Sequence, residues 1–188
     1  MENQIRTLFI GEIQRNCDFA LVAYGDMTKY MQPTDKETLD RFWLSAESFL
    51  IAVANISKIL WPSRPNKCNK CNFQPDLPPE VSTRRLELRT ILDVDNSSPI
   101  NSRKFRNYFE HYDFQIEEWA KKSNKQVIFD SNIGTIGPII RNLSNSISIR
   151  RNFNSSDMIL YFVDESYNVN QVLKAVQDLL NKTKTVNL

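Results

Sequence analysis

Two long amphipathic segments separated by a proline open this chain and limit what it can fold into more than any other feature. Apolar residues recur every three or four positions over residues 3–31, and Pro33 disfavours helix in the residue before it. A second periodic segment runs up to Pro62, and Thr34 and Glu37 have the spacing of a capping box at its start. The pattern therefore predicts two long helices in succession.

Each of these helices should turn its apolar residues toward a shared core. In the first helix the residues expected to face inward are Ile5, Leu8, Phe9, Ile13, Phe19, Ala20, Ala23 and Met27. In the second helix they are Leu39, Phe42, Trp43, Ala46, Phe49, Leu50, Val53, Ile56, Leu60 and Trp61.

Two further helices are expected after a long loop. Residues 62–79 contain five prolines, which predicts a loop. A basic helix should follow over residues 80–92, with Val81, Leu86 or Leu88, and Ile91 inward. Ser98 and Pro99 fit an N-cap and first helical position, so a fourth helix is expected over residues 99–122. Its inward stripe would be Phe105, Phe109, Tyr112, Ile116 and Trp119.

The periodicity changes after residue 124. Short strands are expected over residues 126–129, 147–153 and 158–163, followed by a last helix over 169–181. The predicted fold class is mainly α, a bundle of about four helices followed by a small α+β tail of short antiparallel strands and a final helix. Two parts are expected, a bundle over residues 1–124 and an extension over 125–188 packed on it.

Composition argues for an ordinary soluble protein rather than a polycation. The net charge is +2, from 24 basic and 22 acidic residues, so bulk charge does not predict non-specific nucleic-acid binding. The start of the sequence lacks the pattern of a signal peptide, and the longest apolar run is too short to cross a bilayer. Three cysteines do not suggest a disulfide scaffold. We expect a cytoplasmic protein with reduced thiols and without a membrane partner.

The chemistry concentrates around the only histidine, His111. On a helix, Asn107 and His111 would share a face, and Arg106, Glu110 and Asp113 would form the adjacent row. Arginine matches phosphate oxygens, and histidine exchanges protons near neutral pH. The set is a candidate phosphate-handling site, with Arg106, His111 and Asn107 as catalytic residues and the two carboxylates as supports.

A plainer interpretation of the same residues stays open. Arg106 and Glu110 would then form a surface ion pair, and His111 would pack at a seam between helices. Under that interpretation the motif has no catalytic role.

Three sequence pieces resemble one family. They are Ile-Ser-Lys-Ile-Leu-Trp-Pro over residues 56–62, Arg-Asn-Tyr-Phe-Glu-His-Tyr-Asp over 106–113, and Tyr-Phe-Val-Asp-Glu-Ser-Tyr-Asn over 161–168. The central piece resembles the signature of the HEPN superfamily (higher eukaryotes and prokaryotes nucleotide-binding domains), an arginine, a polar residue and a histidine four to six positions after the arginine. All three together resemble an uncharacterised bacterial branch of abortive-infection type, over residues 1–180.

This resemblance implies a metal-independent endoribonuclease without a cofactor that acts as a homodimer. It also implies a role in phage defence or in a toxin-antitoxin system, with an antitoxin protein as a partner. The alternative within the family is a non-catalytic scaffold or interaction protein.

Basic residues near the motif could guide an RNA backbone toward it. They are Arg84, Arg85, Arg89, Arg103 and Lys104, although arginines solvated on exposed faces explain them as well. Cys68 and Cys71 form a lone C-x-x-C pair. Because zinc normally takes four ligands, this pair is a weak metal candidate and no metal is expected.

Overall fold

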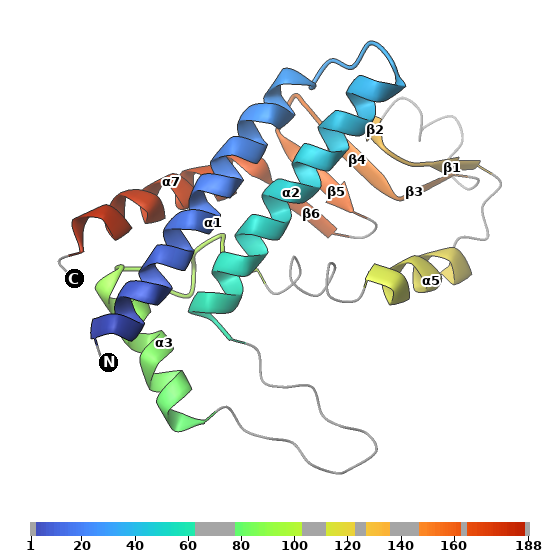
Figure 1. Ribbon diagram of the computed structural model, residues 1–188. Helices are drawn as coiled ribbons and strands as arrows, with labels where there is room; N and C mark the ends of the chain where they lie inside the picture. Colours follow the sequence, from blue (N-terminus) through green and yellow to red (C-terminus); the bar gives the residue numbers. More distant parts are fainter. Residues whose placement is uncertain are drawn as a thin grey trace.

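A computed structural model describes residues 3–62, 78–102, 112–122, 127–135, 147–162 and 165–186. This part of the chain is mostly helical, with a small mixed sheet and a C-terminal helix (Figure 1). Its helices are α1 (Asn3–Lys29), α2 (Lys36–Leu60), α3 (Pro79–Ile91), α5 (Tyr112–Lys122) and α7 (Val169–Thr185). Its strands are β1 (Val127–Phe129), β2 (Asn132–Ile133), β3 (Ile147–Ile149), β4 (Arg151–Asn154), β5 (Ile159–Phe162) and β6 (Glu165–Asn168).

Helices α1 and α2 form an antiparallel hairpin that runs the length of the molecule (Figure 1). The capping box at the start of α2 lies one residue later than expected from Thr34 and Glu37. The Thr38 N–H donates to the Asp35 carboxylate at 2.8 Å, and the Asp35 N–H donates to Thr38 Oγ1 at 3.2 Å. Asp35 rather than Thr34 is the N-cap, because a carboxylate is the better acceptor at a helix N-terminus, where the helix dipole favours negative charge.

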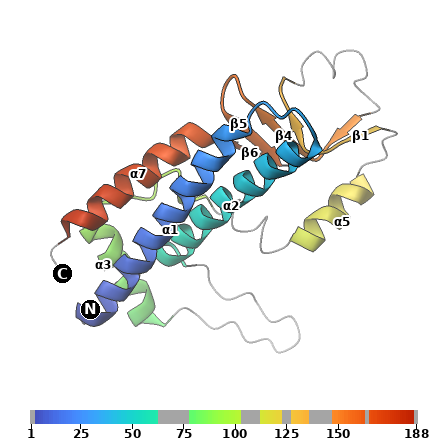
Figure 2. The ribbon, with the colours of Figure 1, turned by 45° about the horizontal axis from the view of Figure 1, so that its top comes forward.

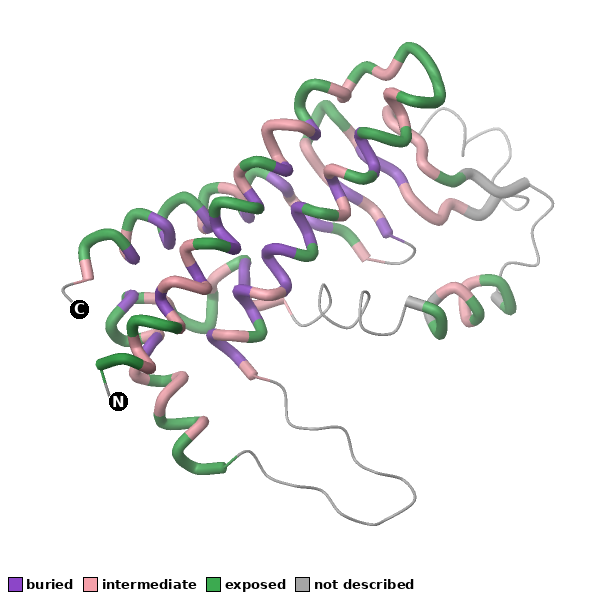
Figure 3. Tube along the Cα trace, viewed as in Figure 1, coloured by how far each residue is buried: buried purple, intermediate pink, exposed green. Residues whose placement is uncertain are grey.

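The core lies on one side of this hairpin (Figure 3). In α2 the predicted inward residues are all buried except Leu39, which is half-buried. In α1 the predicted face is partly wrong, because Leu8 is 62% exposed and Phe19 57% exposed. The buried face contains the predicted Ile13, Ala20, Ala23 and Met27, together with Ile10 and Cys17, which were not predicted. Small residues such as Cys17 and Ala20 let α1 approach its neighbours closely, which favours this face.

The C-terminal helix completes the packing around α1. It lies alongside α1 on the side opposite α2, as both ribbon views show (Figures 1 and 2). Asn168 caps its start by accepting from the Gln171 N–H at 3.0 Å. The helix extends to Thr185, past the predicted end at residue 181, and its apolar stripe is buried at Val172, Val176, Leu179 and Leu180.

The sheet differs from the expected antiparallel strands, because it is mixed. In this four-stranded sheet, β4, β5 and β6 form an antiparallel meander and β2 pairs with β4 in parallel. Strands β1 and β3 form a separate two-stranded parallel sheet. A buried hydrogen bond of 2.6 Å from Asn132 to Asn152 supports the β2–β4 pairing. The two short polar strands β2 and β6 were not expected as strands, since they lack an apolar run.

Aromatic side chains attach this sheet to the hairpin. The ring of Phe42 lies 5.0 Å from that of Phe153, and the ring of Trp43 lies 5.9 Å edge-on from that of Phe162. These contacts join residues from both predicted parts of the chain in one core cluster. The boundary near residue 124 stays a prediction.

The predicted fourth helix is corrected at its start and in its packing. Residues 99–102 form a turn and an extended connection, so no helix begins at Pro99. Helix α5 lies away from the hairpin in both ribbon views (Figures 1 and 2). Ile116 and Trp119 are therefore only half-buried, and Phe114 is 56% exposed. The expected positions of Phe105 and Phe109 lie outside the described residues.

One helix among the described residues, α2, is long and apolar enough to span a membrane by length and composition. Slightly more than half of its most apolar window, 56%, is buried inside the protein. The core helix of a soluble protein has the same properties, and the contacts of α2 with α1 and the sheet give it that position here.

An ion-pair network fixes how α2 meets the sheet. Arg151 donates to both carboxylate oxygens of Asp130, at 2.7 and 3.0 Å, and to Glu47 of α2 at 2.5 Å. Arg150 contacts Asp130 at 3.1 Å, and the Arg151 guanidinium lies 5.6 Å from the centre of the Trp43 ring. Burial raises the pKa of Asp130, but the hydrogen bonds from Arg151 and the charges of both arginines outweigh burial and hold that pKa below its usual range.

Replacing the carboxylate should therefore destabilise the protein in a pH-dependent way. We expect Asp130→Asn to lower the free energy of unfolding by about 2 kcal/mol at neutral pH, measured by urea denaturation. Because the pKa of Asp130 is lower in the folded state, this stabilisation is complete above the unfolded value of about 3.9 and is lost as the pH falls through the folded value. The free energies of unfolding of the wild type and Asp130→Asn should therefore become equal in acid.

Glu37→Gln is the matched control, because Glu37 is also paired with an arginine but is 74% exposed. Its effect should stay below about 0.5 kcal/mol. A loss for Asp130→Asn no larger than that of this control would contradict the role assigned to the network.

Candidate functional site

The proposed catalytic motif is adjacent in sequence to α5. Arg106, Asn107, Glu110 and His111 lie outside the described residues, as do the predicted RNA contacts Arg103 and Lys104 and the candidate metal ligands Cys68 and Cys71. Asp113 lies in the first turn of α5 and is exposed. The part of the predicted site that can be built from the described residues is the basic helix α3.

Helix α3 packs on the hairpin by a narrow contact. Leu88 is its only fully buried side chain, and Leu92 follows it at the C-cap. Of the two alternatives Leu86 and Leu88, Leu88 faces inward and Leu86 is 57% exposed; Ile91, also expected inward, is 36% exposed, and Val81 is half-buried. Because so little apolar surface is buried, the arginines contribute much of the contact between α3 and its neighbours. We call Arg84, Arg85 and Arg89 the α3 arginines.

Arg89 has a structural partner. Its Nη1 donates to the carbonyl oxygen of Leu60 at 2.6 Å, and its guanidinium lies 6.0 Å from the centre of the Trp61 ring. Leu60 is the last residue of α2, where unpaired carbonyls and the negative end of the helix dipole favour a cation. Arg89 therefore caps α2, which makes it a poor candidate for binding RNA.

Arg85 is packed but lacks hydrogen-bond partners. Its guanidinium lies 3.9 Å from the centre of the Phe9 ring of α1, and its Nε and Nη1 are buried with no partner within the described part of the chain. Burial lowers the pKa of Arg85, and the nearby charge of Arg84 lowers it further. Buried donors without acceptors are unfavourable, and an anion placed here would supply acceptors and charge.

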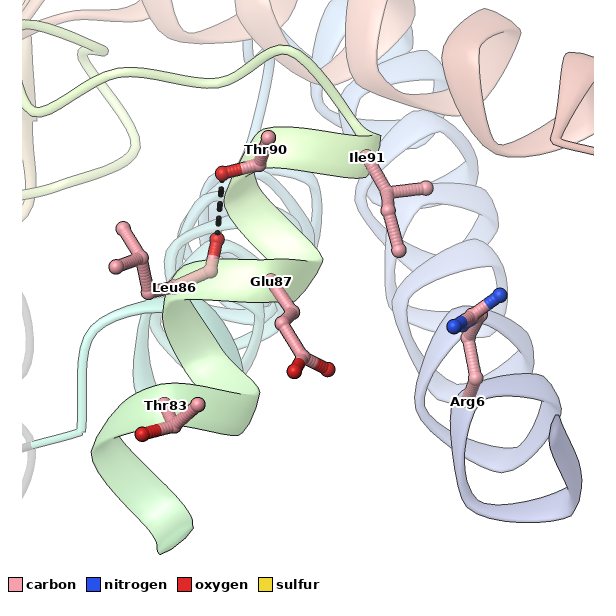
Figure 4. Close-up of a pocket in the computed structure, with 6 residues that line it drawn as sticks. All are labelled: Arg6, Thr83, Leu86, Glu87, Thr90 and Ile91. Atoms are coloured by element: carbon pink, nitrogen blue, oxygen red, sulfur yellow. Dashed lines mark hydrogen bonds between the residues drawn. The ribbon is translucent and has the colours of Figure 1, made fainter. Parts of the chain in front are cut away.

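A separate pocket of about 340 Å³ lies between the N-terminal part of α1 and α3, and none of the α3 arginines is among its lining residues (Figure 4). Arg6 reaches toward it from α1, and Glu87 extends into the space between the two helices. The remaining lining residues are Thr83, Leu86, Thr90 and Ile91. The Nε of Arg6 is buried without a partner among the described residues. Sequence reasoning missed Arg6, because only the packing of α3 on α1 brings it to this pocket.

Metal and thiol chemistry find no support among the residues that the structure describes. No group of three or more His, Cys, Asp or Glu side chains comes together there. Cys17 is fully buried in α1, and burial followed by the charge of Asp18 raises the pKa of its thiol to about 12. A neutral buried thiol is neither a nucleophile nor a ready metal ligand.

The described part of the site is thus a junction of α1 and α3 in which Arg89 is engaged by the end of α2 and two nitrogens of Arg85 are buried without a partner among the described residues. No protein-family model matches this chain, and no curated protein or solved structure matches it either. Function is inferred below from the residues and their chemistry.

Arg89 and Arg84 of α3 should differ in their contribution to the stability of the protein. We expect Arg89→Gln to lower the free energy of unfolding by about 1–2 kcal/mol, because it removes a charged hydrogen bond to the end of α2. Arg84→Gln should change it by less than about 0.5 kcal/mol. Urea denaturation of the two variants tests the difference, and equal effects would contradict the capping role of Arg89.

Proposed function

We propose that this protein cleaves RNA without a metal ion, as a homodimer, through Arg106 and His111 of each chain. The observation that carries the proposal is the sequence around the only histidine, where an arginine and an asparagine precede His111 by five and four positions. This set resembles the HEPN signature and stands directly before α5.

The chemistry requires more than one chain. Cleavage by the neighbouring 2′-hydroxyl needs a base for that hydroxyl, an acid for the departing 5′-oxygen and positive charge near the phosphorane. One histidine cannot be base and acid in the same step. In the proposed dimer His111 takes one role and His111 of the partner subunit takes the other. Arg106 stabilises the phosphorane, Asn107 orients the substrate, and Glu110 and Asp113 support the cationic pair.

The junction of α1 and α3 supports an RNA substrate. The buried nitrogens of Arg85 have no acceptor among the described residues, and Arg84 beside it adds a second positive charge. A phosphate group would supply both hydrogen-bond acceptors and negative charge, since arginine binds phosphate through several donors at once. Arg103 and Lys104 lie between α3 and the motif in sequence and extend this basic character. The cellular role that fits is cytoplasmic phage defence or a toxin neutralised by an antitoxin protein.

The nuclease activity is tested with mixed RNA in the presence of a chelator. We expect wild-type protein to cleave, and His111→Ala and Arg106→Gln to lose at least about a hundredfold in rate, because each removes a proton-transfer group or the phosphorane's counter-charge. Arg41→Gln is the matched control, an exposed arginine on α2 that should leave the rate unchanged. Equal cleavage by wild type and His111→Ala, or none by either, would contradict the enzyme assignment.

RNA binding by the α3 arginines is measurable apart from cleavage. For an uncleavable 2′-deoxy oligonucleotide, we expect Arg84→Gln and Arg85→Gln each to weaken binding and to reduce the slope of log affinity against log salt by about one. Fluorescence anisotropy at several salt concentrations gives that slope. Arg89→Gln should leave it unchanged, because Arg89 is occupied at the end of α2. If all three variants reduced the salt slope equally, Arg89 would bind RNA as Arg84 and Arg85 do, which would contradict its assignment as a cap.

A non-catalytic scaffold or interaction protein is the second candidate, and a specific observation favours it. Large apolar side chains are exposed on the hairpin, including Val22 at 65% and Leu44 at 67%. Exposed apolar residues that gather in one patch are typical of protein contacts. RNA binding or self-association without cleavage by the wild type would support this alternative.

A further inference from the structure

A regular stripe of exposed and half-buried residues runs along α1 on the side turned away from the core. Its members follow one another at alternating intervals of three and four residues, the 3.5-residue repeat of helices that pair with another helix. We call this stripe the α1 seam; it consists of Glu12, Arg15, Phe19, Val22, Asp26 and Lys29. Among the described elements, α2 and α7 make the most contacts with α1 and lie on opposite sides of it (Figure 2), whereas Phe19 and Val22 stay exposed.

The middle of the seam is apolar. Phe19 is 57% exposed and Val22 is 65% exposed. A hydrogen bond of 3.2 Å from Asn55 to Asn16 aligns the two antiparallel helices one turn away. One turn further along the antiparallel pair, this register brings Phe19 of α1 to the level of Ile51 of α2, which is 46% exposed. The apolar patch thus continues from α1 onto α2.

Charged pairs flank this apolar centre on both sides. Arg15 contacts Glu12 at 2.7 Å before it, and Lys29 contacts Asp26 at 2.7 Å after it. From the N-terminal end, the seam therefore reads negative, positive, apolar, apolar, negative, positive. Read in the opposite direction, the same order carries the opposite sign at every charged position.

We infer that two copies of the chain pair through the α1 seam in antiparallel orientation. Phe19 would face Val22 of the partner subunit, Arg15 would face Asp26 of the partner subunit, and Glu12 would face Lys29 of the partner subunit. Every charged position then meets its opposite, whereas a parallel pair in register would place like charges together. At 27 residues, α1 is about 40 Å long and holds the whole overlap.

This inference deepens the proposed function by naming the surface that makes the dimer. It rests on that function only for the requirement of two chains, since self-association is measured without RNA. Two apolar layers at the centre imply a concentration-dependent dimer, and the flanking charges select its orientation.

Two half-swapped variants test the pairing. One carries Glu12→Lys and Arg15→Glu, and the other carries Asp26→Lys and Lys29→Glu. Each keeps the ion pairs within its own helix but places like charges across the seam. We expect the dimer dissociation constant of each variant, from sedimentation equilibrium, to rise about tenfold or more. An equal mixture of the two should recover wild-type association as a heterodimer, because the half-swaps are complementary.

A matched pair of phenylalanines tests the apolar centre. Phe19→Glu should abolish dimerisation, whereas Phe114→Glu, at an equally exposed site on α5, should not. The circular dichroism spectrum of each variant shows whether it folds as the wild type does. A monomeric wild type, half-swaps that associate as the wild type does, or a mixture that stays monomeric would each overturn the inference. None of these results decides the proposed function, which the cleavage assay tests separately.

Discussion

The guanidinium of Arg151 holds the two halves of this fold together. It joins Glu47 of α2 to Asp130 beside the sheet, above the ring of Trp43, so that one cation satisfies two carboxylates and an aromatic face. The rings of Phe42 and Phe153, whose centres lie 5.0 Å apart, join α2 to the sheet in the core. With the sheet fixed on α2, α7 follows from β6 and has one place to pack, alongside α1.

The reliability of the sequence pattern depended on how apolar residues are distributed around each helix. In α2 they occupy one broad face, so periodicity alone identified the core. In α1 they occur on two sides, and the pattern did not show that Cys17 would be buried in the core while Phe19 stayed exposed. Strands β2 and β6 were missed because long-range pairing, not local propensity, makes those polar segments extended.

The same limit applies to the candidate site. Composition identified α3 as basic, but the role of each arginine depends on neighbours distant in sequence. Arg89 caps α2 because that helix ends beside it, and the guanidinium of Arg85 is shielded from solvent because it packs on the ring of Phe9 of α1. Arg6 joined the site for the same reason. The Arg106 and His111 motif differs, since its proposed role rests on the order of its residues alone.

The wrong prediction for Phe19 and the proposed pairing of α1 have one cause. Helix α1 has a buried apolar face and, on another side, the α1 seam with Phe19 and Val22 at its centre. The core of one chain covers only the buried face. A charged residue at position 19 would have removed the ambiguity at no loss to the core. The exposed phenylalanine, flanked by ion pairs of mirrored sign, is better explained by a second partner than by folding of one chain.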